Sequence, residues 1–306
     1  MKKSVYDYYI IEREHRALRS PLSPESVSEY TKGDLSPDER VCRRFEIVCK
    51  NEQPKIHPDE KIVLVRTVCD VKDCFSEEEW REIKKDHYIH ELGYVSNLSL
   101  DYERVLQTGL LSLKEKATEY QARVIDAIIG LCDRYKEEAA KMGRNDIVEV
   151  LTQVPRYKAR NFYEALQFFR ILHYSLWLEG DYHNTVGRFD MYMYPYLEAD
   201  MKKGLYTEET ALELLEDFFI SFNKDSDIYP GVQQGDNGQS MVLGGADLDG
   251  NYHFNTLSKL CLIASRNLKL IDPKINLRVC KNTPAEDTTE DTQTIPNNLT
   301  ERFGSY

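Results

Sequence analysis

The chain has 306 residues, of which 41% are hydrophobic and 30% charged, which is typical of a folded globular protein and not of a disordered one. Its 52 acidic residues outnumber its 40 basic ones, and the formal net charge is −12. An acidic surface repels nucleic acids and anionic membranes, and no apolar run approaches the roughly 18 residues of a membrane helix. Neither nucleic acid nor a membrane is therefore an expected partner.

The seven cysteines are irregularly spaced and include no Cys-x-x-Cys pair. The N-terminus is basic but has no apolar core behind it, unlike a secretory signal. We therefore expect reduced thiols in a cytoplasmic protein. His87 and His90 lack the spacing of zinc proteases and a third ligand, so the sequence predicts no metal site.

Helix signals dominate the first two thirds of the chain. Ser36 and Ser76 each begin a predicted capping box, with glutamate three residues later. Between them, the β-branched run 61–66 (KIVLVR) predicts a strand or a buried extended segment. A longer helix is predicted from Leu113 to Met142, with Gly143 capping its end.

Three further helices are predicted over 162–178, 191–203 and 208–223. The first of them is apolar on most sides, which predicts burial in the core. The third has Thr207 in the capping position and an acidic first turn, as the helix dipole favours.

The pattern changes after Asn223. Residues 239–243 and 276–280 predict two strands, separated by a turn at 247–251 and by a helix over 254–270. Strand, helix, strand in this order predicts a βαβ unit of a parallel sheet. Residues 285–306 are polar and aperiodic, and are expected to be disordered or loosely attached.

Several short segments follow one another in a recognisable order. They are 93–96 (GYVS), 101–106 (DYERVL), 161–169 (NFYEALQFF), 187–192 (GRFDMY), 243–245 (LGG) and 273–279 (PKINLRV). In this order the chain resembles, over roughly residues 5–284, the N-terminal part of the glycyl radical enzymes, the pyruvate formate-lyase family. The segments resemble the dehydratase, decarboxylase and lyase branch more closely than pyruvate formate-lyase itself.

The resemblance implies a helix-rich α/β fold. Family members form a ten-stranded α/β barrel of two parallel half-barrels, and this chain would supply an incomplete half-barrel wrapped by helices. The expected organisation is a pyruvate formate-lyase-like domain over 1–284, followed by a polar tail over 285–306 that is disordered or frameshifted.

The resemblance also implies a radical mechanism. In the family, a separate activase that uses S-adenosylmethionine and an iron–sulfur cluster installs a radical on a glycine. The radical passes to a cysteine, whose thiyl attacks a small-molecule substrate, and the enzymes are typically homodimers. No cofactor is expected to be bound directly by this chain.

Two family motifs are absent from the sequence. No cysteine has glutamate two positions later, and there is no Arg-Val-x-Gly-aromatic motif for the radical glycine. We therefore predict no catalytic residue here. We interpret the chain as the N-terminal part of such an enzyme, of dehydratase, lyase, decarboxylase or formate C-acetyltransferase type, inert without its C-terminal half or activase. The alternatives are one half of a split enzyme and a non-catalytic helical binding or scaffold protein, so the enzyme assignment stays open.

The resemblance assigns four candidate substrate-binding residues: Tyr94, Thr185, Arg188 and Asp190. Tyr94 stands where glycerol-dehydratase-like members place a histidine, and Thr185 where many dehydratases have serine. A structural alternative exists for each. Tyr94 can be a packed tyrosine, and Arg188 and Asp190 can form a structural ion pair at the start of a helix.

Overall fold

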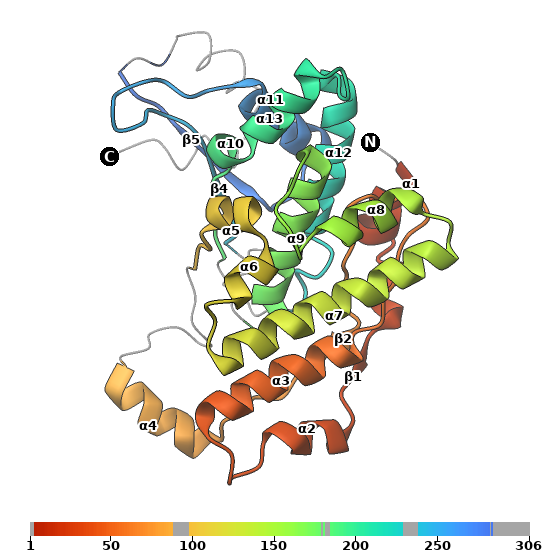
Figure 1. The fold of residues 1–306 in the computed structure, drawn as a ribbon, viewed down its shortest axis with the longest axis vertical. Coiled ribbons are helices and arrows are strands. Elements are labelled where there is room, and N and C mark those ends of the chain that lie inside the picture. Colours follow the sequence, from red (N-terminus) through yellow and green to blue (C-terminus); the bar gives the residue numbers. More distant parts are fainter. Residues whose placement is uncertain are drawn as a thin grey trace.

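The computed structural model describes residues 3–87, 98–178, 180, 184–228, 238–281 and 283. Helices make up most of it, and Figure 1 shows them packed around and beside one small sheet, which confirms the predicted helix-rich α/β class. The α-helices are α1 (Lys3–Tyr6), α2 (Pro24–Tyr30), α3 (Pro37–Asn51), α4 (Glu77–His87), α5 (Tyr102–Thr108), α6 (Leu110–Lys114), α7 (Glu119–Lys141), α8 (Asn145–Gln153), α9 (Phe162–Leu178), α10 (Phe189–Tyr192), α11 (Tyr194–Lys202), α12 (Glu208–Ser221) and α13 (Thr256–Leu268). A π-helical turn (Asp7–Ile11) and a 3-10 turn (Glu14–Leu18) follow α1.

The main sheet has three parallel strands in the order β3 (Gly187–Arg188), β4 (Ser240–Gly244) and β5 (Lys274–Arg278). Ser240 pairs with Lys274 and Gly244 with Arg278, so β4 and β5 are in register along their whole length. Helix α13 connects β4 to β5, which confirms the predicted βαβ unit. Two residues each of β1 (Ser20–Pro21) and β2 (Val68–Cys69) form a separate parallel pair.

Helix α9 is the centre of the core, as its apolar sequence predicts. It contacts α3, α5, α8, α11 and α12. Phe169 on this helix stacks on Tyr102 of α5, with 4.2 Å between the ring centroids, and meets Phe218 of α12 edge-to-face at 5.3 Å. Aromatic pairs of this kind fix the helices that surround α9 and, through them, the position of the sheet.

Several predicted helix boundaries differ from those observed. The predicted helix 113–142 is two helices, because Thr118 and Gln121 form a capping box that starts α7 at Glu119. The predicted helix 191–203 is likewise divided into α10 and α11, with Pro195 in the first turn of α11, where its missing N–H costs nothing. Gly143 does cap α7 with a φ of +71°, as expected.

The two capping boxes predicted at serine residues have different outcomes. Ser76 and Glu79 form a complete box, with Ser76 Oγ accepting from the Glu79 N–H at 3.2 Å and Glu79 Oε2 from the Ser76 N–H at 2.8 Å. At α3 only the serine half forms, because the Glu39 carboxylate accepts hydrogen bonds from Arg123 of α7 instead. The side chain therefore links α3 to α7, which lie side by side in Figure 1.

The segment 61–66 is buried but is not a strand. Ile62, Val63, Leu64 and Val65 are each at most 1% exposed, and a φ of +87° at Leu64 interrupts the extended backbone. Side chains satisfy the backbone in place of a neighbouring strand. The donors and acceptors are Gln167 for Val63, Tyr135 and Tyr174 for Val65, Arg170 for Leu64 and Lys224 for Ile62. Of the two predictions for this segment, the buried segment is the one confirmed.

The two faces of the main sheet differ in burial. Met241, Leu243 and Ile275 are buried, whereas Val242 and Asn276, which alternate with them, are only partly buried. Within the described residues, β5 pairs with β4 alone, and its second edge has no strand beside it. A parallel sheet is normally covered on both faces, so this sheet has room for further strands and cover.

Candidate functional site

The candidate site lies at the carboxyl ends of the three parallel strands. Ligands of open parallel sheets commonly bind outside this end. Arg188 ends β3 and leads directly into α10, which carries Asp190, while Gly244 ends β4 and Arg278 ends β5. Thr185 lies two residues before β3. Tyr94, the fourth predicted residue, lies outside the described residues.

Thr185 is held against the backbone of Leu98. The Thr185 N–H donates to the Leu98 carbonyl oxygen at 2.7 Å, and Thr185 Oγ1 donates to the same oxygen at 3.3 Å. The side chain is half-buried. Its hydroxyl oxygen retains acceptor capacity, so a contact with substrate stays a prediction.

Arg188 is directed at the loop that follows β4. Its Nη2 donates to the Gly244 carbonyl oxygen at 2.9 Å and its Nη1 donates to the Ala246 carbonyl oxygen at 3.3 Å. These bonds fix the path of the loop across the end of the sheet. Arg188 as a whole is only partly buried.

Asp190 is fully buried, with 0% of its surface exposed. Its Oδ2 accepts from the Gly244 N–H at 2.6 Å and from Ser258 Oγ at 2.7 Å, and its carbonyl oxygen accepts from Asn255 Nδ2 at 3.0 Å. Asn255 and Ser258 form the capping box that begins α13. Asp190 thereby joins α10, the end of β4 and the start of α13.

Burial raises the pKa of Asp190, against the hydrogen bonds from Gly244 and Ser258 and the charge of Arg188, which act in the opposite direction. Arg188 and Asp190 do not form the direct structural ion pair that was one interpretation of their spacing. Each bonds the loop residue Gly244 instead. Their geometry is that of positioning residues, and contact of either with a substrate stays a prediction.

Two glycines allow β5 to approach this loop closely. Gly244 and Gly245 have φ values of +67° and +84°, and a Cβ at Gly245 would lie 2.8 Å from Arg278 Cβ. Only glycine fits there without displacement. We did not predict Arg278 as a site residue, although its position at the end of the second predicted strand was a usable signal.

The turn that follows at 247–251 is formed as predicted. Asp247 Oδ1 accepts from the N–H groups of Asp249 and Asn251, both at 2.9 Å. His253 Nε2 and Asp247 Oδ2 are 2.8 Å apart. Hydrogen bonds from His253 and Asn251 hold the pKa of Asp247 well below its usual range.

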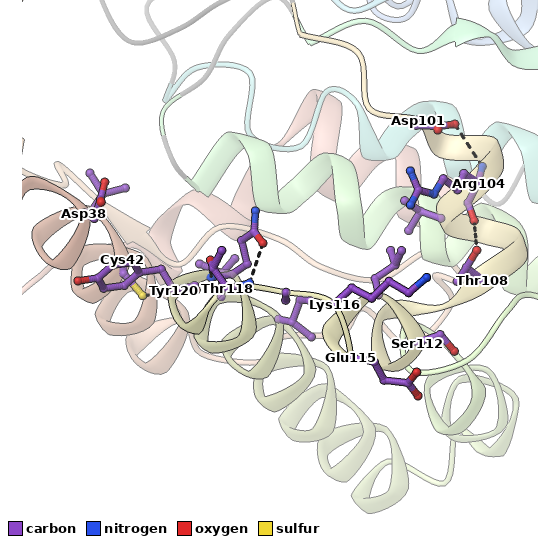
Figure 2. Close-up of a pocket in the computed structure, with 17 residues that line it drawn as sticks. Asp38, Cys42, Asp101, Arg104, Thr108, Ser112, Glu115, Lys116, Thr118 and Tyr120 are labelled. Atoms are coloured by element: carbon purple, nitrogen blue, oxygen red, sulfur yellow. Dashed lines mark hydrogen bonds between the residues drawn. The ribbon is translucent and has the colours of Figure 1, made fainter.

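A separate open cleft of about 1010 Å³ lies elsewhere, between α3, α5, α6 and α7. Figure 2 shows Arg104 and Thr108 at one end of the cleft, Asp38 and Cys42 at the other, and Lys116 between them. Both acidic and basic side chains line the cleft. Asp101 caps the N-terminus of α5, because its Oδ1 accepts a hydrogen bond from the Arg104 N–H. Of the predicted residues that the structure describes, Thr185, Arg188 and Asp190, none lines this cleft.

Within the described residues, the structure contains neither a metal-binding cluster nor a membrane-spanning helix. The described side chains include no group of three or more His, Cys, Asp and Glu arranged to hold a metal ion. His90 and the side chain of His87 lie outside them. Among the helices of the described ranges, none has the length and apolar character to cross a membrane.

Comparison with known families defines the class of protein. The pyruvate formate lyase-like family model matches residues 66–290, so the chain belongs to that family. The resemblance to glycyl radical enzymes is thereby confirmed. The expected domain boundary at residue 284 stays a prediction, because residues 284–306 lie outside the described residues.

Individual relatives confirm the dehydratase and lyase branch. The chain is 26% identical to the (2S)-3-sulfopropanediol dehydratase of Klebsiella oxytoca over 88% of this chain and 38% of that protein. It is 29% identical to the isethionate sulfite-lyase of Oleidesulfovibrio alaskensis over 67% of this chain and 29% of that protein. The chain thus spans well under half the length of these relatives.

A solved structure supports the fold. The glycyl radical enzyme from Archaeoglobus fulgidus superimposes with a TM-score of 0.74 at 19% sequence identity, over 94% of this chain and 50% of that chain. At this identity the likeness shows the fold alone. It confirms the expectation of a partial glycyl radical enzyme barrel wrapped by helices.

Proposed function

We propose that these residues form part of the barrel wall of a glycyl radical enzyme that dehydrates or cleaves a small molecule. The observation that carries the proposal is the sheet β3–β4–β5. Within the described residues, β5 has one strand neighbour, and the face that carries Val242 and Asn276 is only partly buried. Parallel sheets are normally covered on both faces, and membership of the family supports the proposal that the remaining barrel supplies the further strands and cover.

The proposed reaction is of the dehydratase or lyase type found in the relatives, and not the transfer of an acetyl group to formate. One relative is named as the dehydratase of a sulfopropanediol and another as a lyase that releases sulfite from isethionate. We expect the same general class of reaction, with a small-molecule substrate enclosed by the completed barrel. Enclosure matters because water and reductants would quench a radical intermediate.

The radical residues are proposed to lie in polypeptide outside this sequence. The sequence contains neither the Cys-x-Glu nor the Arg-Val-x-Gly-aromatic motif. The proposed partners are therefore a chain or segment that carries both motifs and a S-adenosylmethionine and iron–sulfur activase that acts on its glycine. A homodimer and a cytoplasmic location are part of the same proposal.

The test compares the chain alone with the chain completed by such a partner. The 306-residue chain is incubated anaerobically with the activase and S-adenosylmethionine, and the glycyl radical is sought by electron paramagnetic resonance. We expect no radical signal and no turnover from the chain alone. Coexpression with the C-terminal part of the Klebsiella dehydratase should increase the yield of soluble protein, because it supplies strands to the open edge of β5.

The full-length Klebsiella dehydratase with the same activase is the positive control, since it shows that the activase is active. Two results would contradict the proposal: a glycyl radical signal or turnover from the 306 residues unaided, or a chain that melts cooperatively as a monomer and gains nothing from coexpression. The second result would favour the alternative of a scaffold or binding protein.

A further inference from the structure

A second pocket lies where the N-terminal segment packs against the ends of α12 and α13. Its volume is about 390 Å³, within the usual range of small-molecule sites. Residues 6–16 form one wall, and residues 223–227 and 269–271 form the other. Asn223 Nδ2 donates to the Asp272 carbonyl oxygen at 2.7 Å, which places this wall beside the amino end of β5. The candidate site described above is at the opposite, carboxyl end.

The lining of this pocket carries an excess of positive charge. Arg13, Arg16 and Lys269 line it, against a single carboxylate, Asp227. That carboxylate is already used: it accepts from Arg19 at 2.6 and 3.2 Å, and Arg16 Nε lies 3.3 Å away. The excess is notable in a chain whose net charge is −12.

Arg13 and Lys269 are available for a ligand. Arg13 Nε donates to the Ile10 carbonyl oxygen at 3.1 Å, which orients the guanidinium and leaves its terminal nitrogens unused. No described carboxylate pairs with Arg13 or Lys269, and the acidic neighbours of Arg13, Glu12 and Glu14, do not line the pocket. Burial lowers the pKa of Arg16. The positive charges of Arg13 and Arg19 act in the same direction, and the charge of Asp227 opposes them.

The backbone at both available cations is unusual. Arg13 has a φ of +57° and Lys269 a φ of +53°, and four described residues other than glycine have positive φ. A left-handed conformation is unfavourable for arginine and lysine, and at Lys269 it ends α13, as is common at helix C-termini. Both residues line the same pocket, although they are far apart in the sequence.

We propose that this pocket binds a small oxyanion, the phosphoryl or carboxylate group of a metabolite, between Arg13, Arg16 and Lys269. Arginine guanidinium groups match both oxyanions by paired hydrogen bonds, and lysine adds a point charge. A bound anion would join the N-terminal segment to the end of α13. The proposal is independent of the barrel proposal, because it concerns another end of the sheet and its test measures binding rather than activity.

The test is isothermal titration calorimetry of the 306-residue chain, coexpressed with its complementary part if the chain alone precipitates. The probes are sodium phosphate and sodium acetate, at ionic strength matched with sodium chloride. The variant Arg13→Asn/Lys269→Asn removes both charges, and asparagine tolerates the left-handed backbone at both positions. The matched control is Arg81→Gln/Lys85→Gln on α4, where the same charges are removed from side chains that are each 67% exposed.

We expect saturable binding of at least one probe and an affinity weakened about tenfold or more in the double variant, with less than about a twofold change in the control. Tighter phosphate binding identifies a phosphoryl ligand, and tighter acetate binding a carboxylate ligand. If the double variant fails to fold, Lys269→Gly serves in its place, because glycine adopts this φ freely. Saturation by neither probe, unchanged affinity in the variant or an equal loss in the control would overturn the proposal.

Discussion

Arg188 and Asp190 bond the same residue through its two backbone groups. Arg188 Nη2 donates to the Gly244 carbonyl oxygen at 2.9 Å, and Asp190 Oδ2 accepts from the Gly244 N–H at 2.6 Å. A cation and a carboxylate two positions apart thus fix the end of the neighbouring strand instead of neutralising each other. The geometry at the carboxyl edge of the sheet depends on both.

We expect Asp190→Ala to destabilise the chain by about 2–4 kcal/mol. The substitution leaves the buried Gly244 N–H without its acceptor and leaves the Ser258 hydroxyl only the longer bond to Asn255 Oδ1 at 3.3 Å. The free energy of unfolding in urea measures the effect. Asp249→Ala, in the exposed turn beside the site, is the matched control and should change stability by less than about 0.5 kcal/mol. Equal effects of the two substitutions would show that the Asp190 contacts are not stabilising.

The close approach at Gly245 can be tested with alanine. Gly245→Ala places a Cβ 2.8 Å from Arg278 Cβ at a φ of +84°, so we expect a loss of about 1–3 kcal/mol. Gly130→Ala is the opposite case. Gly130 lies in α7, and a Cβ there meets nothing within 4 Å, so alanine should raise stability by about 0.5–1 kcal/mol. Thermal melting of the two variants should therefore shift in opposite directions, and a shift in the same direction would contradict the described backbone.

The pair Arg66 and Glu52 should be costly to break. Arg66 Nε donates to Glu52 Oε1 at 2.7 Å, and the two side chains are 3% and 0% exposed. Arg66→Met leaves a buried carboxylate without its cation, which typically costs about 3–5 kcal/mol. Arg81→Met, which breaks the exposed pair with Glu78, should cost less than about 1 kcal/mol. Chemical denaturation of both variants distinguishes them, and similar costs would argue against a buried pair.

Asp217 should make stability depend on pH. Burial raises its pKa to about 6, although the Lys61 N–H, which donates to Oδ2 at 3.0 Å, and Lys224 favour the charged form. Because the folded pKa exceeds the unfolded value of about 3.8, the folded state keeps the proton longer. The protonated Asp217 therefore contributes its full stabilisation to the free energy of unfolding below about pH 4, and this stabilisation is lost as the pH rises through about 6.

The variant Asp217→Asn removes this titration while its amide oxygen can still accept from Lys61. The wild-type free energy of unfolding should decline relative to the variant by up to about 3 kcal/mol between pH 4 and pH 7. The difference between the two proteins isolates Asp217 from all other titrating groups. Parallel pH profiles for the two proteins would refute a raised pKa.

The amino-acid sequence by itself determined the helices with strong local signals and the order of the βαβ unit. Thr207 before α12, the apolar composition of α9 and the turn at Asp247 each act within a few residues along the chain. Such signals can be read locally, because caps, turns and helix faces depend on near neighbours in the sequence. The ordered segments that resemble the glycyl radical enzymes likewise indicated the helix-rich α/β fold class.

The tertiary structure alone decided which distant groups meet. The Glu39 side chain accepts a hydrogen bond from Arg123 on α7 instead of completing the cap of α3. The segment 61–66 is not a strand but a buried stretch, and side chains of α7 and α9 form hydrogen bonds with its backbone. The same holds for the link from Asp190 to Gly244 and for the cations that Arg13 and Lys269 bring into one pocket. These contacts join residues that are 50 or more positions apart, and no spacing pattern encodes them, because they are set by how helices and strands pack once each has formed.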